Sequence, residues 1–285
     1  MKTGIIMEGG AMRGMFTAGV TDVLMENDIT FDGAIGVSAG AAFGSNLKSK
    51  QIGRAARYNL KYCRDKRYCS LRSLIFTGDY YGADFCYHQL PDKLDPFDTE
   101  TFDNNPMEFY AVCTDVYTGK PVYKKCEKAG YELYEWIRAS ASLPLAARIV
   151  DVGGMRLLDG GISDSVPLKF FESIGYDRNI IILTQPKGYI KQKSSFIPLI
   201  SVLFRKYPNI IKALKDRHNM YNETIKYICE KEEKGEVLVI RPKEALPIKR
   251  TEHTKDKLET VYETGRTVAL ERLDEIKNFL NIKAE

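Results

Sequence analysis

The sequence predicts an α/β protein of three layers (α/β/α), in which helices cover both faces of a mainly parallel central sheet. Two observations lead to this fold class. The start of the chain holds two successive strand-turn-helix units, and short aliphatic runs typical of strands buried on both faces recur later. Because parallel strands need a crossover connection, successive units of this kind imply a parallel sheet with helices packed on its faces.

The two units at the start of the chain are well defined. Residues 3–7 form a short β-type run, residues 8–14 a glycine-rich turn, and residues 15–27 carry apolar side chains at helical spacing. Residues 33–37 then predict a buried strand, and residues 39–47 are small and helix-forming. Ser38 therefore occupies a sharp corner between a strand and a helix.

The later elements follow the same kinds of signal. Residues 109–116 and 121–124 predict strands on either side of a turn, and residues 131–141 predict a helix that ends before Pro144. Residues 148–152 and 155–158 predict a hairpin across two glycines, with Asp159 at the end of its second strand. Residues 179–183 and 237–240 are two more short aliphatic runs, and we expect both to be buried strands.

Two regions are less regular. Residues 51–105 are rich in tyrosine, cysteine and charge without a clean period, so we expect helices and loops laid over the sheet. Residues 185–236 predict a long, mostly helical insertion that contains an apolar run at 196–204. We therefore expect a core over residues 1–185. Residues 186–285 would supply a helical insertion plus a C-terminal strand and helix that complete the same domain.

Composition excludes several classes of function. The net charge of +4, from 42 basic and 38 acidic residues, does not suggest a nucleic-acid partner, and the basic stretch at 61–72 is typical of a solvated face. The three histidines lie far apart and match no metal motif, so we expect neither a metal nor another cofactor. The initial apolar run is too short for a signal peptide, and residues 196–204 fall short of the roughly 18 that a spanning helix needs. These features favour a cytoplasmic protein.

The corner at Ser38 carries the first chemical signal. Residues 36–40 are G-x-S-x-G, with a predicted strand before the motif and a predicted helix after it. Gly36 and Gly40 let the strand and the helix approach each other, and the helix start brings free N–H groups and a positive dipole end beside the serine. The pentapeptide alone is weak support for a nucleophile, but its position between strand and helix strengthens the hypothesis.

A second glycine-rich segment ends the first predicted strand. It comprises Gly9, Gly10, Ala11, Met12, Arg13 and Gly14. In a parallel sheet this loop lies near the end of the strand that leads to Ser38, where its N–H groups can stabilise an oxyanion, at about 3–4 kcal/mol of barrier per donor. The alternative is a phosphate loop, but Met15 and Phe16 replace the lysine and hydroxyl residue that such a loop requires.

A serine nucleophile needs a base. His218 and His253 lie downstream, but neither follows a predicted strand, and both are more typical of solvated surface residues. Asp159 is the better candidate because it ends a predicted strand and is followed by Gly160 and Gly161. An Asp-Gly-Gly sequence by itself usually marks only a turn.

Taken together, the three segments resemble the signature of the patatin-like phospholipase family. That signature is a glycine-rich oxyanion loop with a basic residue, a G-x-S-x-G elbow and an aspartate in D-G-[GA], and all three occur here in the family's order. The likeness runs from about residue 3 to residue 185. It implies a patatin-like catalytic core that hydrolyses acyl esters of lipids with a Ser-Asp dyad and no histidine. By position, Ser38 is the nucleophile and Asp159 the general base. The amides around Gly10, Ala11 and Met12 form the oxyanion hole, which Arg13 helps to hold.

Two expectations follow from this assignment. The family usually has a third glycine where this chain has Ala11, and an alanine forced to a positive φ would cost on the order of 1 kcal/mol. An aspartate has an ordinary pKa of about 3.9, so Asp159 must gain basicity from burial and from its geometry with Ser38. We therefore expect modest turnover that falls as the pH drops.

Alternatives remain open at this stage. An acyltransferase would use the same acyl-enzyme, and a catalytically idle lipid-binding protein would keep the fold without the reaction. The apolar run within residues 193–206, which has basic residues at its ends, is typical either of a lid or interfacial anchor at a membrane surface or of a buried core helix. The sequence does not specify the head group, the acyl-chain length or the oligomeric state.

Overall fold

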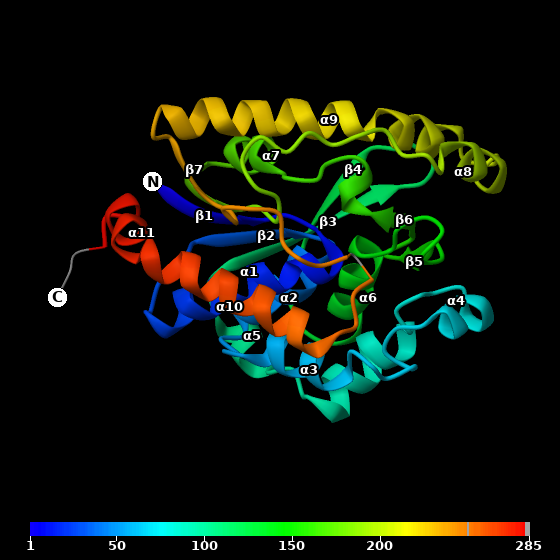
Figure 1. Ribbon diagram of the computed structural model, residues 1–285, viewed down its shortest axis with the longest axis horizontal. Helices are drawn as coiled ribbons and strands as arrows, with labels where there is room; N and C mark the ends of the chain where they lie inside the picture. The colour runs from blue at the N-terminus through cyan, green and yellow to red at the C-terminus, as the bar shows by residue number, and fades with distance from the viewer. Residues whose placement is uncertain (250, 283–285) are drawn as a thin grey trace.

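The computed structural model describes residues 1–249 and 251–282 (Figure 1), so the predicted region 186–285 includes four residues outside the described part. Its centre is one mixed sheet in the order β5-β6-β3-β2-β1-β7-β8, with β4 also paired to β3. The strands are β1 (Lys2–Met7), β2 (Gly33–Val37), β3 (Glu108–Asp115), β4 (Pro121–Lys125), β5 (Val150–Val152), β6 (Met155–Asp159), β7 (Tyr176–Ile182) and β8 (Val237–Ile240).

The middle of the sheet is parallel, as predicted. Strands β1, β2, β3, β7 and β8 run in the same direction, with Ile5 opposite Ala34 on one side and Ile180 on the other. Strands β4, β5 and β6 are antiparallel to their neighbours. The hairpin between β5 and β6 turns at Gly153 and Gly154, which both have positive φ. The carboxyl ends of β1 and β2 therefore lie side by side, and they carry the glycine-rich loop and Ser38.

Helices cover both faces of this sheet. Two short 3₁₀ turns, Ala11–Arg13 and Gly160–Ile162, and a π-helix at Phe85–Leu94 complete the helical elements. The α-helices are α1 (Gly14–Glu26), α2 (Ala39–Lys48), α3 (Arg54–Tyr62), α4 (Leu71–Thr77), α5 (Thr99–Asn104), α6 (Tyr131–Ser140), α7 (Leu168–Ser173), α8 (Ile197–Leu203), α9 (Pro208–Glu233), α10 (Lys255–Glu271) and α11 (Leu273–Phe279).

The alternation of side chains along the strands explains the layers. In β1, Ile5 and Met7 belong to the core on the side of α1, α2 and α10, whereas Ile6 belongs to the core on the side of α7 and α9. Figure 1 shows α9 and α7 above the sheet and α1, α2 and α10 below it. The three-layer α/β/α fold predicted from the sequence is therefore confirmed.

The irregular region follows its prediction as well. Residues 54–104 form α3, α4, the π-helix and α5, joined by loops, and they lie below the sheet at the level of α6 in Figure 1. The C-terminal residues form β8 and two helices instead of the single predicted one. Helix α10 packs closely on α1, because Gly265 and Gly19 leave no side chain between the two backbones.

Candidate active site

Ser38 lies at the junction of β2 and α2 in a backbone conformation that few residues adopt. Its φ is 55° and its ψ is −122°, and the residue is 9% exposed. The N–H groups of Ala41 and Ala42 both donate to the Ser38 carbonyl at 3.0 Å, so α2 begins directly at this residue. This sharp corner points the hydroxyl away from the sheet and places it at the positive end of α2.

Ser140, at the end of α6, holds this corner. The backbone N–H of Ser38 donates to Ser140 Oγ at 2.9 Å, and Ser140 Oγ donates to the Val112 carbonyl at 2.6 Å. Ser140 is completely buried, so both bonds are shielded from water. The sequence analysis did not single out Ser140, because a small polar residue at the end of a helix carries no distinctive motif.

The glycine-rich loop packs directly against Ser38. A Cβ atom on Gly9 would lie 2.8 Å from the Ser38 Cβ, so only glycine fits at this approach. Ala11 has a φ of 48° and starts the 3₁₀ turn, which the Arg13 N–H stabilises by donating to the Gly10 carbonyl. With its amide oxygen turned toward Arg13, Gln185 accepts from Nη1 at 2.7 Å.

Asp159 ends β6, where it pairs with Cys113 of β3. The residue is 1% exposed, and its Oδ1 accepts the Gly161 N–H at 2.7 Å. The Asp159 N–H donates to the Ser142 carbonyl at 2.9 Å, just beyond the end of α6. The same end of α6 therefore fixes the backbone of both Ser38 and Asp159.

Ser38 and Asp159 line one small pocket of about 30 Å³. Of the predicted site residues, it also contains Gly9, Gly10, Ala11, Arg13 and Gly161. Met12 lines the neighbouring larger cavity, and Gly14 begins α1. The three other motif glycines lie in β2 (Gly36), in α2 (Gly40) and in the second 3₁₀ turn (Gly160). Those three glycines permit close packing behind the site, because a Cβ on any of them would meet backbone atoms.

The larger cavity has a volume of about 770 Å³ and also reaches Ser38. Its walls are mainly apolar and aromatic, and include Phe43, Leu90, Phe97, Ile137 and Leu143. Exposed residues of the segment 192–196 line it too, so the cavity opens to solvent beside α8. A cavity of this size and lining suits a long apolar ligand.

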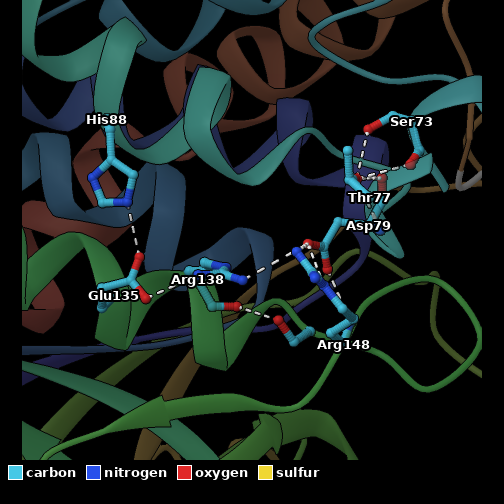
Figure 2. A network of polar contacts seen from close by, with 8 residues as sticks. Ser73, Thr77, Asp79, His88, Glu135, Arg138 and Arg148 are labelled. Carbon is cyan, nitrogen blue, oxygen red and sulfur yellow. Dashed lines mark hydrogen bonds and ion pairs between the residues drawn. The ribbon is translucent and has the colours of Figure 1, made fainter.

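Figure 2 shows a network of charged residues, of which Asp79 and Arg138 line this cavity. Glu135 of α6 accepts from Arg138 at 3.0 Å and contacts His88 Nε2 at 2.9 Å. Asp79 lies 3.7 Å from Arg138 and 3.3 Å from Arg148, and it accepts the Arg148 N–H at 2.9 Å. These pairs compensate the charge of the buried carboxylates. They also join the segment after α4 to α6, the helix whose end fixes the backbone of Ser38 and Asp159.

Four further residues of the site were missed by the sequence analysis. Glu8 and Tyr221 are buried and bonded to each other, while Lys191 and Arg217 line both the pocket and the cavity. Burial and then the charge of Glu8 raise the pKa of Tyr221 above its ordinary value, so the phenol stays a hydrogen-bond donor. The available signal in the sequence was an arginine at helical spacing from two apolar residues, Leu214 and Tyr221.

The interpretation of His218 as a solvated surface residue was wrong. His218 is half-buried and lines the large cavity, because it lies on the face of α9 that packs toward the sheet. It does not line the small pocket that holds Asp159. His253 is exposed, as predicted.

Metals and membrane spans were searched as well. Within residues 1–249 and 251–282, no group of three or more His, Cys, Asp or Glu side chains could hold a metal ion. None of the helices in that part of the chain has the length and apolar content needed to cross a membrane.

Comparison with known proteins gives two matches to family models. Residues 5–171 match the model described as patatin-like phospholipase, and residues 207–281 match a domain of unknown function, DUF6363. The uncharacterized protein YjjU of Escherichia coli K12 is 30% identical over 192 residues, which are 65% of this chain and 52% of that protein. Lysophospholipase nte1 of Aspergillus fumigatus is 27% identical over 184 residues, which are 61% of this chain and 11% of that enzyme.

The chain thus spans about half of the bacterial relative and about a tenth of the fungal one. Among solved structures, VipD from Legionella pneumophila aligns with a TM-score of 0.47 at 11% identity, over 96% of this chain and 67% of VipD. The matched segment 5–171 covers more than half of the chain and contains the end of β1, the elbow at Ser38 and the turn at Asp159. The chain belongs to the patatin-like phospholipase family.

Proposed function

We propose that this protein is a serine acyl hydrolase that cleaves fatty-acyl esters of lipids with Ser38 as nucleophile and Asp159 as general base. Membership of the patatin-like phospholipase family supports a lipid acyl hydrolase. The observation that carries the finer assignment is the single small pocket lined by Ser38, Asp159 and the glycine-rich loop.

The reaction would begin with acylation of Ser38. Asp159 accepts the hydroxyl proton as Oγ attacks the ester carbonyl carbon, and the carbonyl electron pair moves onto the oxygen. Amides of the loop around Gly10, Ala11 and Met12 stabilise that oxyanion, assisted by the helix start at Ser38. The C–O bond then breaks, and the leaving alkoxide takes the proton from Asp159.

Deacylation repeats these steps with water. Asp159 removes a proton from the water molecule, whose oxygen attacks the acyl carbon of the ester on Ser38. The second tetrahedral intermediate collapses to a fatty acid, and Ser38 Oγ recovers its proton from Asp159. The large cavity that adjoins Ser38 would hold the acyl chain during both steps, since its volume of about 770 Å³ and its apolar walls suit hydrocarbon.

The lipid substrate also implies a surface from which it is drawn, and we propose that the mouth of the cavity faces an anionic lipid surface. Apolar side chains of the segment 193–206 that are at least half exposed are Phe196, Leu199, Val202 and Leu203. Helix α4 adds Leu71, Ile75 and Phe76, which are still more exposed. Both helices lie at the same end of the molecule in Figure 1.

Charge around these apolar groups favours an anionic rather than a neutral surface. Lys193, Arg205 and Lys206 are exposed beside α8, and Arg72 is exposed on α4. A basic residue near an anionic membrane contributes about 1 kcal/mol to binding. The proposed docking surface is therefore the exposed apolar residues of α4 and α8 together with these four cations.

The decisive test compares wild type with Ser38→Ala and Asp159→Asn for labelling by a fluorophosphonate and for hydrolysis of p-nitrophenyl acyl esters. We expect wild type to label and turn over, and both variants to lose activity by on the order of 10³-fold or more. Ser173→Ala and Asp151→Asn, at exposed positions away from the pocket, serve as controls.

Two further readouts sharpen this test. The rate constant kcat/KM should fall as the pH drops, because protonated Asp159 accepts no proton. Product analysis with an added alcohol separates hydrolysis from acyl transfer. Wild type that binds lipid yet neither labels nor turns over would instead favour an idle lipid-binding protein.

A further inference from the structure

We infer that helix α9, which lies outside the patatin-like segment, completes the active site, with Arg217 and Tyr221 as positioning residues for the two loops that do the chemistry. This inference rests on the proposed function of Ser38 and Asp159. It also gives a role to part of residues 207–281, which match a domain of unknown function.

The sequence of α9 explains why these two side chains reach the site. Its buried apolar residues are Ile210, Leu214, Tyr221 and Ile228, which recur at spacings of four and seven residues, that is, after about one and two helical turns. Arg217 falls on the same stripe between Leu214 and Tyr221. The stripe that packs α9 onto the protein therefore presents a guanidinium and a phenol to the interior rather than to solvent.

Arg217 contacts the turn that carries Asp159. Its Nε donates to the Gly161 carbonyl at 2.5 Å, and the N–H of the same Gly161 donates to Asp159 Oδ1 at 2.7 Å. A Cβ built on Gly161 would lie 3.0 Å from Asp159 Oδ1 and 3.2 Å from Arg217 Nη2, so the carboxylate and the guanidinium both lie against Gly161. Arg217 therefore fixes this turn and adds positive charge beside the carboxylate.

Tyr221 acts on the other loop through Glu8, the residue just before Gly9. Its hydroxyl donates to Glu8 Oε1 at 2.8 Å, and Thr184 donates to Glu8 Oε2 through its N–H at 2.6 Å and its hydroxyl at 3.0 Å. Glu8 is 2% exposed and Tyr221 1%. Because a buried carboxylate is costly without donors, these bonds hold the start of the glycine-rich loop in one position.

One helical turn of α9 thus holds both halves of the proposed machinery. Arg217 reaches the turn of the general base, and Tyr221 reaches the loop of the oxyanion hole through Glu8. The charged groups that line this pocket are Glu8, Arg13, Asp159, Lys191 and Arg217. Lys191 also places its Nζ 3.9 Å from the centre of the Tyr221 ring, a cation–π contact that packs against the phenol.

The experiment compares Arg217→Met, Arg217→Lys and Tyr221→Phe with wild type for kcat, KM, fluorophosphonate labelling and the pH profile of kcat/KM. We expect Arg217→Met to lower kcat and the labelling rate by roughly 10- to 100-fold, with KM within about threefold, because the apolar walls of the substrate cavity are unchanged. The acid limb of its kcat/KM profile should move to higher pH by roughly half a unit or more, because the variant lacks the cation that favours ionised Asp159. Arg217→Lys should restore the acid limb and part of kcat.

Tyr221→Phe removes one hydroxyl without changing the ring. We expect a loss of roughly 10-fold in kcat and in the labelling rate, from displaced oxyanion donors. Tyr227→Phe is the matched control, because Tyr227 lies on the same helix and its hydroxyl donates at 2.6 Å to Glu172, which does not line the pocket. Lys215→Met is the control for Arg217, since Lys215 is an exposed cation of α9.

The outcomes separate this inference from the function on which it rests. Suppose that Tyr221→Phe and Arg217→Met fold and keep the kcat and pH profile of wild type, while Ser38→Ala is inactive. That result would overturn the role of α9 and leave the proposed dyad in place. A change equal to that of the two control variants would do the same. Should Arg217→Met not fold, Tyr221→Phe still decides whether α9 contributes, because it keeps the packing of the ring. Full activity in Ser38→Ala would overturn the function and the inference together.

Discussion

At the scale of single residues, the site contains two strained backbone positions. Ser38 and Ala11 both have positive φ without being glycine, and both line the small pocket. Conformations of this kind cost about 1–3 kcal/mol each and persist only where neighbouring structure fixes them. Here the bond from Ser38 to Ser140 and the close approach of Gly9 supply that fixation.

The strain at Ala11 leads to a prediction. Ala11 already adopts the φ of 48° that a glycine would adopt easily, so Ala11→Gly should relieve strain without moving the loop. We expect an increase of roughly 0.5 kcal/mol in the free energy of unfolding, since the greater flexibility of glycine in the unfolded chain offsets part of the gain. Chemical denaturation measures this change.

A matched control and an activity assay complete the test of Ala11. Ala213→Gly, within α9, should lower the free energy of unfolding by about 0.5–1 kcal/mol, because glycine is costly inside a helix. The kcat/KM of Ala11→Gly should stay within about twofold of wild type. A large rise in activity would contradict this, since it would mean that alanine displaces an oxyanion donor.

At the scale of elements, local signals predicted most of the fold. The strand 33–37 and the corner at Ser38 follow directly from an aliphatic run and a G-x-S-x-G motif, and β2 has those bounds. The C-terminal helices were less clear, because 255–279 is divided into α10 and α11 at Arg272 by contacts made only in the folded chain, such as the bond that Arg272 Nη1 donates to the Val239 carbonyl of β8. Local sequence thus determines that a segment is helical, whereas tertiary contacts determine where one helix ends and the next begins.

The site divides in the same way. Motif residues such as Ser38 and Asp159 could be named from the sequence, because their spacing and flanking glycines are specific to a reaction. Ser140, Glu8 and Arg217 could not, because their role depends on which loops the fold brings beside them. Arg217 is the clearest case, since its interest appears only once α9 is seen to pack its stripe against the turn at Gly161.

Helices α4 and α8 carry the prediction for the proposed docking surface. Ile75→Asp with Phe76→Asp, or Val202→Asp with Leu203→Asp, places charge where apolar side chains would enter the lipid interface. We expect each pair to lower binding to vesicles of phosphatidylcholine with about one third phosphatidylglycerol by on the order of 10-fold or more. Vesicle sedimentation measures the bound fraction.

Two controls separate docking from catalysis. Hydrolysis of a short soluble ester should be unchanged in these variants, because none of the four residues lines the cavity. Leu270→Asp alters a half-exposed leucine on α10, on the other side of the sheet from α8, and should bind vesicles like wild type. Equal binding by all variants would contradict the assignment of α4 and α8.

At the scale of the whole molecule, the sheet joins parts that are far apart in the sequence. Strand β8 pairs in parallel with β7, and α10 returns to pack on α1 at the opposite end of the chain. Tyr262 of α10 also donates to the buried Asp22 of α1 at 2.8 Å, and burial raises the pKa of that carboxyl. We propose on these grounds that residues 186–285 complete the same domain as residues 1–185.

If the chain is a single cooperative domain, a substitution that destabilises α10 should also lower the stability measured at α6. A Cβ on Gly265 would lie 2.9 Å from the carbonyl carbon of Phe16, so Gly265→Ala forces α10 away from α1 and should lower the free energy of unfolding by about 1–3 kcal/mol. Trp136, the sole tryptophan, is buried in α6 and reports from the other part of the chain. Its fluorescence transition should shift by the same amount as the transition in helical circular dichroism.

Thr264→Ala, which removes only a hydroxyl bonded to the Thr260 carbonyl on an exposed face, should leave both transitions in place. A Trp136 transition that stays fixed while helicity is lost earlier would contradict a single domain and show that the C-terminal helices unfold as a separate unit.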